Sequence, residues 1–177
     1  MHALFANKVA TLAMLLTDEL ARALGDYSPS AASLLLTLHY QGPMTTTALA
    51  AVADISQPTA VRVTDRLVRL GLIQREARAG RTTPLRLTRA GERHATALQR
   101  DRLEAMSRVV DVLDGTDRKH FERAMNKILR DAIHSRAFAR TTCRLCDHSV
   151  CVGKLCPIGS KASALEREMK SDNTRAR

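Results

Sequence analysis

Four cysteines lie close together near the end of the chain, in the stretch CRLCDHSVCVGKLCPIG. Their spacing is C-x2-C-x4-C-x4-C, and the chain has no other cysteine. A C-x2-C pair can give two thiolates to one metal ion, and two further cysteines can complete a tetrahedron. The pattern therefore predicts a metal centre, for which His148 is a substitute ligand and the four expected ligands are Cys143, Cys146, Cys151 and Cys156.

Three kinds of cysteine chemistry fit this spacing. Structural zinc comes first, because compact four-cysteine sites are a common form of tetrahedral zinc ligation. An iron–sulfur cluster is the alternative, since four thiolates also hold such clusters and Cys156-Pro157 resembles the Cys-Pro ending of ferredoxins. A metal-free redox switch is the third, with Arg144 and Lys154 favouring reactive thiolates. The spacing alone does not separate zinc from iron.

Composition limits the kind of protein that carries this centre. The 177 residues suffice for one domain with a core, and the formal net charge of +10 attracts polyanions such as DNA, RNA or anionic lipid surfaces. The aromatic content of 3% argues against a protein that binds single strands by base stacking. The hydrophobic content of 45% argues against a disordered basic tail.

Other classes are excluded by what the chain lacks. No apolar run approaches the roughly 20 residues of a membrane span, and charged residues interrupt the apolar stretch over 1–24, which argues against a signal peptide. We therefore expect a cytoplasmic protein without membrane contact. No serine, histidine and carboxylate set recurs with catalytic spacing, and we expect no enzyme.

The stretch from Ser56 to Leu72, SQPTAVRVTDRLVRLGL, predicts a capped helix with two unlike faces. Ser56 is a good N-cap, Pro58 suits a first turn, and Gly71 suits the end of a helix. One face carries arginines and hydroxyls, which are groups that contact bases and phosphates. The residues expected to face inward are Val61, Leu67, Val68 and Leu70.

The segments around this helix predict a winged helix-turn-helix. A short helix over 45–53 precedes it, and strands over 72–75 and 84–87 follow as a hairpin. Arg78 and Arg81 lie in the hairpin loop, where arginines suit a minor groove. Additional helices, predicted over 3–24, 88–113 and 116–139, indicate a dimerisation module.

The chain resembles the MarR family of winged helix-turn-helix regulators. The resemblance is carried by Leu49-Ala50, by ISQPTAVR at 55–62, by DRLVRLGLIQR at 65–75 and by LRLTRAG at 85–91. It implies a mainly α fold, in which N- and C-terminal helices form the dimerisation module beside a small two-stranded β-wing. It also implies a homodimer that binds a pseudo-palindromic site on double-stranded DNA, usually as a repressor.

The resemblance also implies which residues contact DNA. The wing tip of the family usually has the sequence Asp-Arg-Arg, whereas the matching residues here are Gly80-Arg81-Thr82, so the acid that orients the middle arginine is missing. By this resemblance Arg81 enters the minor groove, and Ser56, Gln57, Thr59 and Arg62 face the major groove. Arg66 and Arg78 are further candidates because of their charge and position.

The sequence thus predicts three parts. Residues 1–140 form the regulator with its helix-turn-helix lobe at about 28–90, residues 141–160 the cysteine-rich metal-binding segment, and residues 161–177 a short helix and a disordered tail. The expected function is a homodimeric, sequence-specific repressor whose metal centre is structural or senses metal or redox state. The alternatives are a regulator that responds to a small-molecule effector and has a purely structural zinc site, and a metal or electron carrier.

Overall fold

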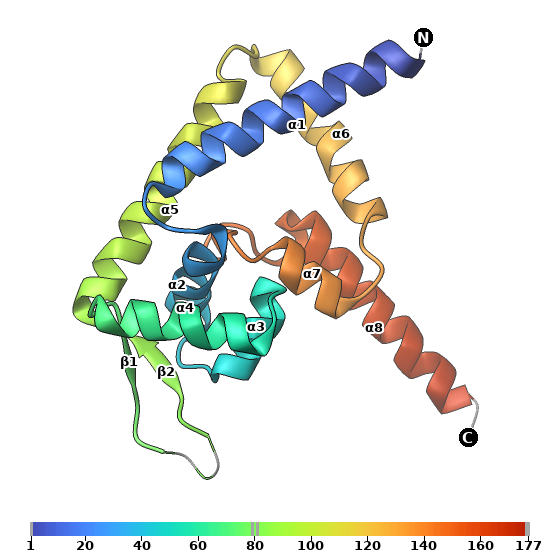
Figure 1. Ribbon diagram of the computed structural model, residues 1–177. Coiled ribbons are helices and arrows are strands. Elements are labelled where there is room, and N and C mark those ends of the chain that lie inside the picture. Colours follow the sequence, from blue (N-terminus) through green and yellow to red (C-terminus); the bar gives the residue numbers. More distant parts are fainter. Residues whose placement is uncertain (1, 79, 81, 176–177) are drawn as a thin grey trace.

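The computed structural model describes residues 2–78, 80 and 82–175, with side chains up to residue 171. It is mainly helical, with one two-stranded antiparallel sheet. The elements are α1 (His2–Leu24), α2 (Pro29–Gln41), α3 (Thr46–Ala53), α4 (Gln57–Arg69), β1 (Ile73–Arg75), β2 (Leu85–Leu87), α5 (Arg89–Val110), α6 (Gly115–Asp131), α7 (Arg136–Thr142), the short 3₁₀ helix η1 (Gly153–Leu155) and α8 (Pro157–Arg175). In Figure 1, α1 packs along α5, while α6 leads to α7 and α8 on the opposite side of the molecule.

Side-chain caps start the helices of the helix-turn-helix lobe, which comprises residues 28–90. Ser28 and Thr45 each accept a hydrogen bond from a first-turn backbone N–H of α2 and α3, at 3.2 Å in both cases. Ser56 caps α4 in the same way, at 3.4 Å from Thr59 N. Between α3 and α4, Asp54 adopts the left-handed conformation with φ 54°, which Asp tolerates better than most residues. These local signals set the tight turn that the sequence predicted.

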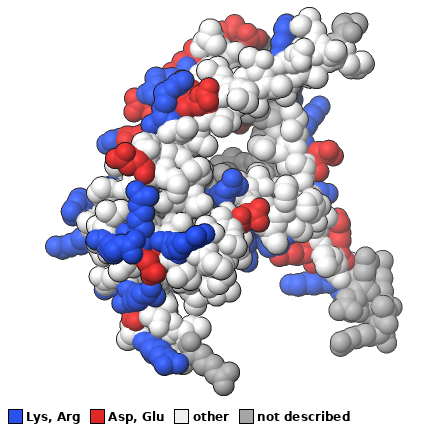
Figure 2. Space-filling view, viewed as in Figure 1, with Lys and Arg blue, Asp and Glu red and all other residues white. Residues whose placement is uncertain are grey.

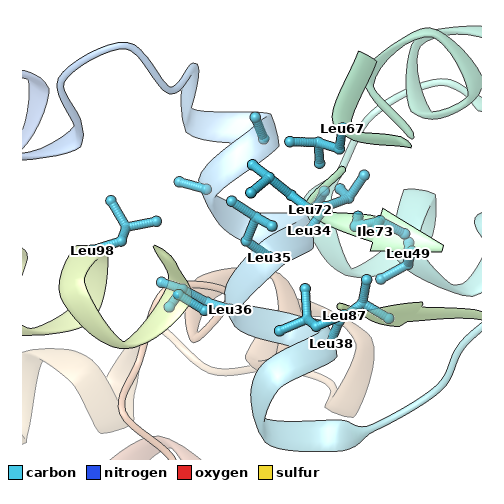
Figure 3. Packing of buried hydrophobic residues seen from close by; sticks show 14 of the residues in the cluster. Leu34, Leu35, Leu36, Leu38, Leu49, Leu67, Leu72, Ile73, Leu87 and Leu98 are labelled. Atoms are coloured by element: carbon cyan, nitrogen blue, oxygen red, sulfur yellow. The ribbon is translucent and has the colours of Figure 1, made fainter. Parts of the chain in front are cut away.

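Helix α2 is the centre of the core, and every residue from Ala31 to Leu38 is buried. Leu34, Leu35 and Leu36 are at most 1% exposed. Leucines and isoleucines from α3, α4, α5 and both strands pack around α2 (Figure 3). Burial of each such side chain contributes about 1.5–3 kcal/mol, so α2 fixes the positions of the surrounding helices.

A close contact joins the start of α5 to the end of the wing. Thr88 caps α5 by accepting from Gly91 N at 3.0 Å, and its own hydroxyl donates to Gly71 O at 2.6 Å. A Cβ atom at position 91 would lie 2.0 Å from Leu72 O, so only glycine fits there. The strands pair with Ile73 opposite Leu87. The end of α4, the wing and α5 are therefore held as one unit.

The prediction of one continuous helix over 116–139 is wrong, because the chain reverses its direction between α6 and α7. Helix α6 is capped at its end by Ala132, and α7 begins after Ser135, whose hydroxyl accepts from Phe138 N at 3.1 Å. The tail also differs from the prediction, since α8 is longer than the short helix expected there. The reversal turns α7 and α8 back towards α3 (Figure 1).

Helices α7 and α8 enclose a small second core around the cysteines. Its buried residues are Ile133, Ala139, Cys143, Cys156, Ile158 and Ala162. Arg136 ties the two helices together, because its guanidinium binds both carboxylate oxygens of Glu166 at 3.0 and 2.8 Å and Ser163 Oγ at 2.8 Å. Across the described residues, no helix has the length and apolar character of a membrane span.

Candidate functional site

The first two turns of α4 present a connected set of polar side chains. Ser56 Oγ lies 2.9 Å from Thr59 Oγ1, and the Arg62 guanidinium donates to the same Thr59 oxygen at 3.3 Å. Ser56, Gln57 and Arg62 are exposed, and Thr59 is half-buried. The four residues predicted to face the major groove therefore lie together on one exposed surface.

Arginines extend this surface along α4. Arg62, Arg66 and Arg69 are exposed, and Figure 2 shows Lys and Arg side chains gathered over α4. Two apolar residues were wrongly predicted to face inward, because Val61 is 40% and Leu70 57% exposed. The buried side of α4 is a narrow stripe of Ala60, Thr64 and Leu67, which leaves most of the helix free for contact.

The wing carries one described candidate for the minor groove. Arg78 is exposed, and its Nε donates to Gly80 O at 3.0 Å. Arg81, the other predicted wing contact, lies outside the described residues. Further back, Arg75 of β1 pairs with Asp65 of α4 at 2.7 Å, and this ion pair links the wing to the helix. The wing and α4 thus form adjoining parts of one basic surface.

The four cysteines surround a single cavity of about 570 Å³. All four are free thiols, and His148 lines the same cavity. Cys143 follows α7, and Cys156 directly precedes α8, so the two helices place the outer cysteines and the intervening chain places the other two. The structure thus brings together all the predicted metal ligands.

The thiols form two hydrogen-bonded pairs. The bond between Cys143 and Cys146 raises the pKa of Cys143 and lowers that of Cys146, whose thiolate is also favoured by the charge of Arg102. Burial and a bond to Cys156 raise the pKa of Cys151. No set of three or more His, Cys, Asp or Glu side chains in the described part of the chain already has the geometry of a metal site. Ligation would therefore require these thiols to lose their protons and converge.

The surroundings of the thiols suit an anionic metal–thiolate group. Gly159 N donates to Cys156 Sγ at 3.1 Å at the start of α8, and a Cβ at position 159 would lie 3.2 Å from that sulfur. Backbone N–H groups at a helix N-terminus stabilise negative charge. Four basic side chains also line the cavity, namely Arg136, Arg140, Lys154 and Arg167. Soft sulfur donors in a basic cavity fit zinc or an iron–sulfur cluster.

A polar contact between the cysteine segment (residues 141–160) and α2 and α5 was not predicted. Burial, and then a hydrogen bond to Asp147, raise the pKa of Tyr40 to about 12. Gln99 is 4% exposed, and Arg102 is half-buried beside it. Burial lowers the pKa of Arg102. Gln99 could have indicated this contact from the sequence, because it is a polar residue among the apolar positions of α5.

A second cavity of about 700 Å³ lies among α1, α2, α4 and α5. Tyr27 and His94 are joined there at 2.6 Å between Oη and Nδ1, and Arg66 and Asp101 also line it. Arg66 therefore adjoins both the exposed surface of α4 and this cavity. Apolar side chains such as Val63, Leu67 and Leu98 complete the lining.

Comparison with known proteins agrees with this geometry. Residues 27–80, which contain α2, α3, α4 and β1, match the model of the MarR family. This segment is therefore similar to the MarR family. A search of curated protein sequences found no match.

Several solved structures share the fold. A MarR family protein from Bacillus stearothermophilus is 23% identical with a TM-score of 0.63, covering 73% of this chain and 93% of its own. MepR, described as a transcription regulator of a Staphylococcus aureus multidrug efflux pump, is 20% identical with a TM-score of 0.60, covering 70% and 96%. YusO from Bacillus subtilis is 18% identical with a TM-score of 0.67, covering 74% and 96%. The chain therefore has the same winged-helix fold as these proteins.

Proposed function

We propose that this protein is a cytoplasmic transcriptional regulator that binds a pseudo-palindromic site on double-stranded DNA as a homodimer. The observation that carries the proposal is the exposed Ser56–Thr59–Arg62 network on α4, beside a basic wing. An α-helix with such groups fits the major groove, where arginine and hydroxyl side chains discriminate between bases. The net charge of +10 supports contact with phosphates.

The exposed apolar faces of α1 and α6 support a homodimer. Leu24 is the one buried residue of α1, and none of the described residues of α6 is buried. Large apolar side chains on these helices are exposed, including Leu4, Phe5, Val9, Ile128 and Leu129. A second copy of the chain would remove this surface from water, and its two-fold symmetry would match that of a palindromic site.

We propose that the protein represses transcription, because a dimer bound to promoter DNA excludes other proteins from that DNA. Binding-site selection from random duplexes with the purified protein gives the operator. Transcription in vitro from a promoter that contains this site should then fall as the protein is added. Selection without an enriched sequence, or binding that ignores sequence at 0.2 M salt, would contradict the proposal.

We further propose that the cysteine segment holds a metal centre, with zinc as the first occupant and an iron–sulfur cluster as the alternative. The support is that four free thiols line one basic cavity. Elemental analysis of protein purified without oxygen identifies the metal, and absorbance near 400 nm distinguishes a cluster from zinc. The variant Cys143→Ser, Cys146→Ser should lose the metal. Retention of the full metal content by this variant would contradict the assignment of these cysteines as metal ligands.

The second cavity favours a small-molecule effector as the second candidate for regulation. Its mixture of apolar side chains with Tyr27, His94 and Arg66 suits an aromatic carboxylate. In that case the metal centre is purely structural, and benzoate, used as the probe, should raise the melting temperature and release the DNA. An unchanged melting temperature and unchanged DNA affinity at millimolar benzoate would remove this candidate.

A further inference from the structure

We propose that the occupied cysteine centre controls DNA affinity by holding the stretch Arg144–His148 against α2 and α5 of the same subunit. This inference rests on the proposed metal centre and on the proposed DNA binding. The stretch begins directly after Cys143, includes Cys146 and ends three residues before Cys151. A change in the positions of Cys143 and Cys146 must therefore move this stretch.

The first contact is apolar. Leu145 packs against the main core, which is built from α2, α3, α4, α5 and the sheet. Helix α7, which ends just before Cys143, also contacts α3, the first helix of the helix-turn-helix. The cysteine segment is thus attached to the lobe that carries α4.

The second contact is a set of hydrogen bonds from one buried side chain of α5. With the Gln99 amide oriented so that its oxygen faces donors and its nitrogen faces an acceptor, Nε2 donates to Leu145 O at 3.3 Å, and Oε1 accepts from Asp147 N at 3.0 Å and from Arg102 at 2.9 Å. A buried amide without hydrogen-bond partners destabilises the folded state. The docked position of the stretch therefore satisfies a group that would otherwise destabilise α5.

The third contact involves the end of α2. The Tyr40 hydroxyl donates to the Asp147 carboxylate, and the Tyr40 ring lies 5.6 Å from the His148 ring. Two residues after Tyr40, the chain leaves α2 and turns towards α3. Tyr40 therefore links the cysteine segment to the connection that positions the helix-turn-helix.

Charge favours the docked position when a metal is bound. Arg102 Nε is buried and has no hydrogen-bond partner among the described residues, and the Arg102 charge acts on Cys146. Four thiolates around a divalent metal or a cluster keep a net negative charge. A half-buried guanidinium beside that charge holds the loaded centre against α5.

Metal loading would cross-link Cys143 and Cys146 to Cys151 and Cys156, and so fix both ends of the docked stretch. The metal-free stretch regains conformational entropy, and its docking weakens. We expect the loaded protein to bind DNA more tightly than the metal-free protein, by about 5-fold or more, as is typical of allosteric coupling.

The test compares full-length protein as purified with protein freed of metal by a chelator and a thiol reductant without oxygen. The DNA is the duplex enriched by selection. Tyr40→Phe removes the hydroxyl bond to Asp147 and keeps the ring, and Gln99→Leu removes the amide at similar volume. Arg100→Gln is the matched control, because Arg100 is exposed on α5 and pairs with Asp101.

All three variants should retain the wild-type metal content. In Tyr40→Phe and Gln99→Leu, the ratio of metal-free to loaded Kd should fall towards one, whereas Arg100→Gln should keep the wild-type ratio. Hydrogen exchange at residues 144–148 and in α3 should slow on loading in the wild type and in Arg100→Gln, but not in Tyr40→Phe or Gln99→Leu.

Four results would overturn the inference and differ in what else they overturn. Equal DNA affinity of loaded and metal-free wild type contradicts the coupling and leaves the metal centre. A wild-type ratio of metal-free to loaded Kd in both Tyr40→Phe and Gln99→Leu has the same consequence. Absence of metal from the purified protein removes the centre as well. Absence of sequence-specific DNA binding removes the proposed regulator and the coupling with it.

Discussion

Thr59 Oγ1 accepts a hydrogen bond from the Arg62 guanidinium at 3.3 Å, and the Ser56 hydroxyl lies 2.9 Å from the same oxygen. The Ser56 hydroxyl that caps α4 therefore also helps, through Thr59, to orient Arg62 nearly two turns further along. An arginine held in this way loses less side-chain entropy when it contacts a base, because its position is partly set before binding.

Replacement of Arg62 should separate sequence-specific recognition from non-specific electrostatic binding to DNA phosphates. Arg62→Ala should weaken binding to the selected duplex by about 1–3 kcal/mol and relax the preference at one base pair. Competition binding against duplexes with single substitutions measures both effects. Arg108→Ala is the control, since Arg108 is exposed on α5 and pairs with Glu104. An unchanged preference in Arg62→Ala would show that α4 is not docked as proposed.

The contact between α5 and the wing should be intolerant of a single methyl group. Gly91→Ala places a Cβ 2.0 Å from Leu72 O, and we expect the free energy of unfolding to fall by about 1–3 kcal/mol. Gly115→Ala is the control, because nothing lies within 4 Å of its added Cβ. Its stability should stay the same or rise by up to about 1 kcal/mol. Urea denaturation compares the two, and equal midpoints would contradict the packing at Gly91.

The apolar face of α1 should determine the oligomeric state. Phe5 is 70% exposed, and Phe5→Glu should shift the protein from dimer to monomer in sedimentation velocity. Both copies change in a symmetric dimer, so the association should weaken by about 3 kcal/mol or more. Asn7→Glu adds the same charge two residues away on a polar face of α1, and this variant should remain a dimer. A dimeric Phe5→Glu variant would place the interface elsewhere.

The start of α8 should affect how firmly the metal is held. In Gly159→Ala the new Cβ lies 3.2 Å from Cys156 Sγ, so the sulfur or the helix must shift. Displacement of a group next to a ligand lowers metal affinity by roughly 10–100-fold, which competition with a chromogenic chelator measures. Metal affinity equal to that of wild type would mean that Cys156 is not a ligand.

Local sequence signals were sufficient to predict the helix-turn-helix and the wing. Ser56 caps α4 where the sequence predicted it, and Ser28 and Thr45 cap α2 and α3 in the same way. The reversal between α6 and α7 was missed, because Ile133 continues the apolar spacing of α6 and Ser135 reads equally well as a helical surface residue. Val61 and Leu70 were placed inward because periodicity does not tell how wide the covered side of a helix is.

The spacing of the cysteines was sufficient to bring them into one group, but it gave no information about what they contact. Gln99 and Asp147 are far apart in the sequence, and their hydrogen bond depends on the reversal after α6. The position of Arg102 beside Cys146 depends on the same reversal. Long-range contacts of this kind have no periodic pattern, so only the folded chain reveals them.

The reversal at Ala132–Ser135 also makes the contact between the cysteine segment and α5 intramolecular. The two partners belong to the same chain, so their effective concentration does not depend on how much protein is present. Dilution that separates two subunits leaves this contact in place. A single subunit can therefore respond to its own bound metal, whereas symmetric binding to DNA requires two subunits.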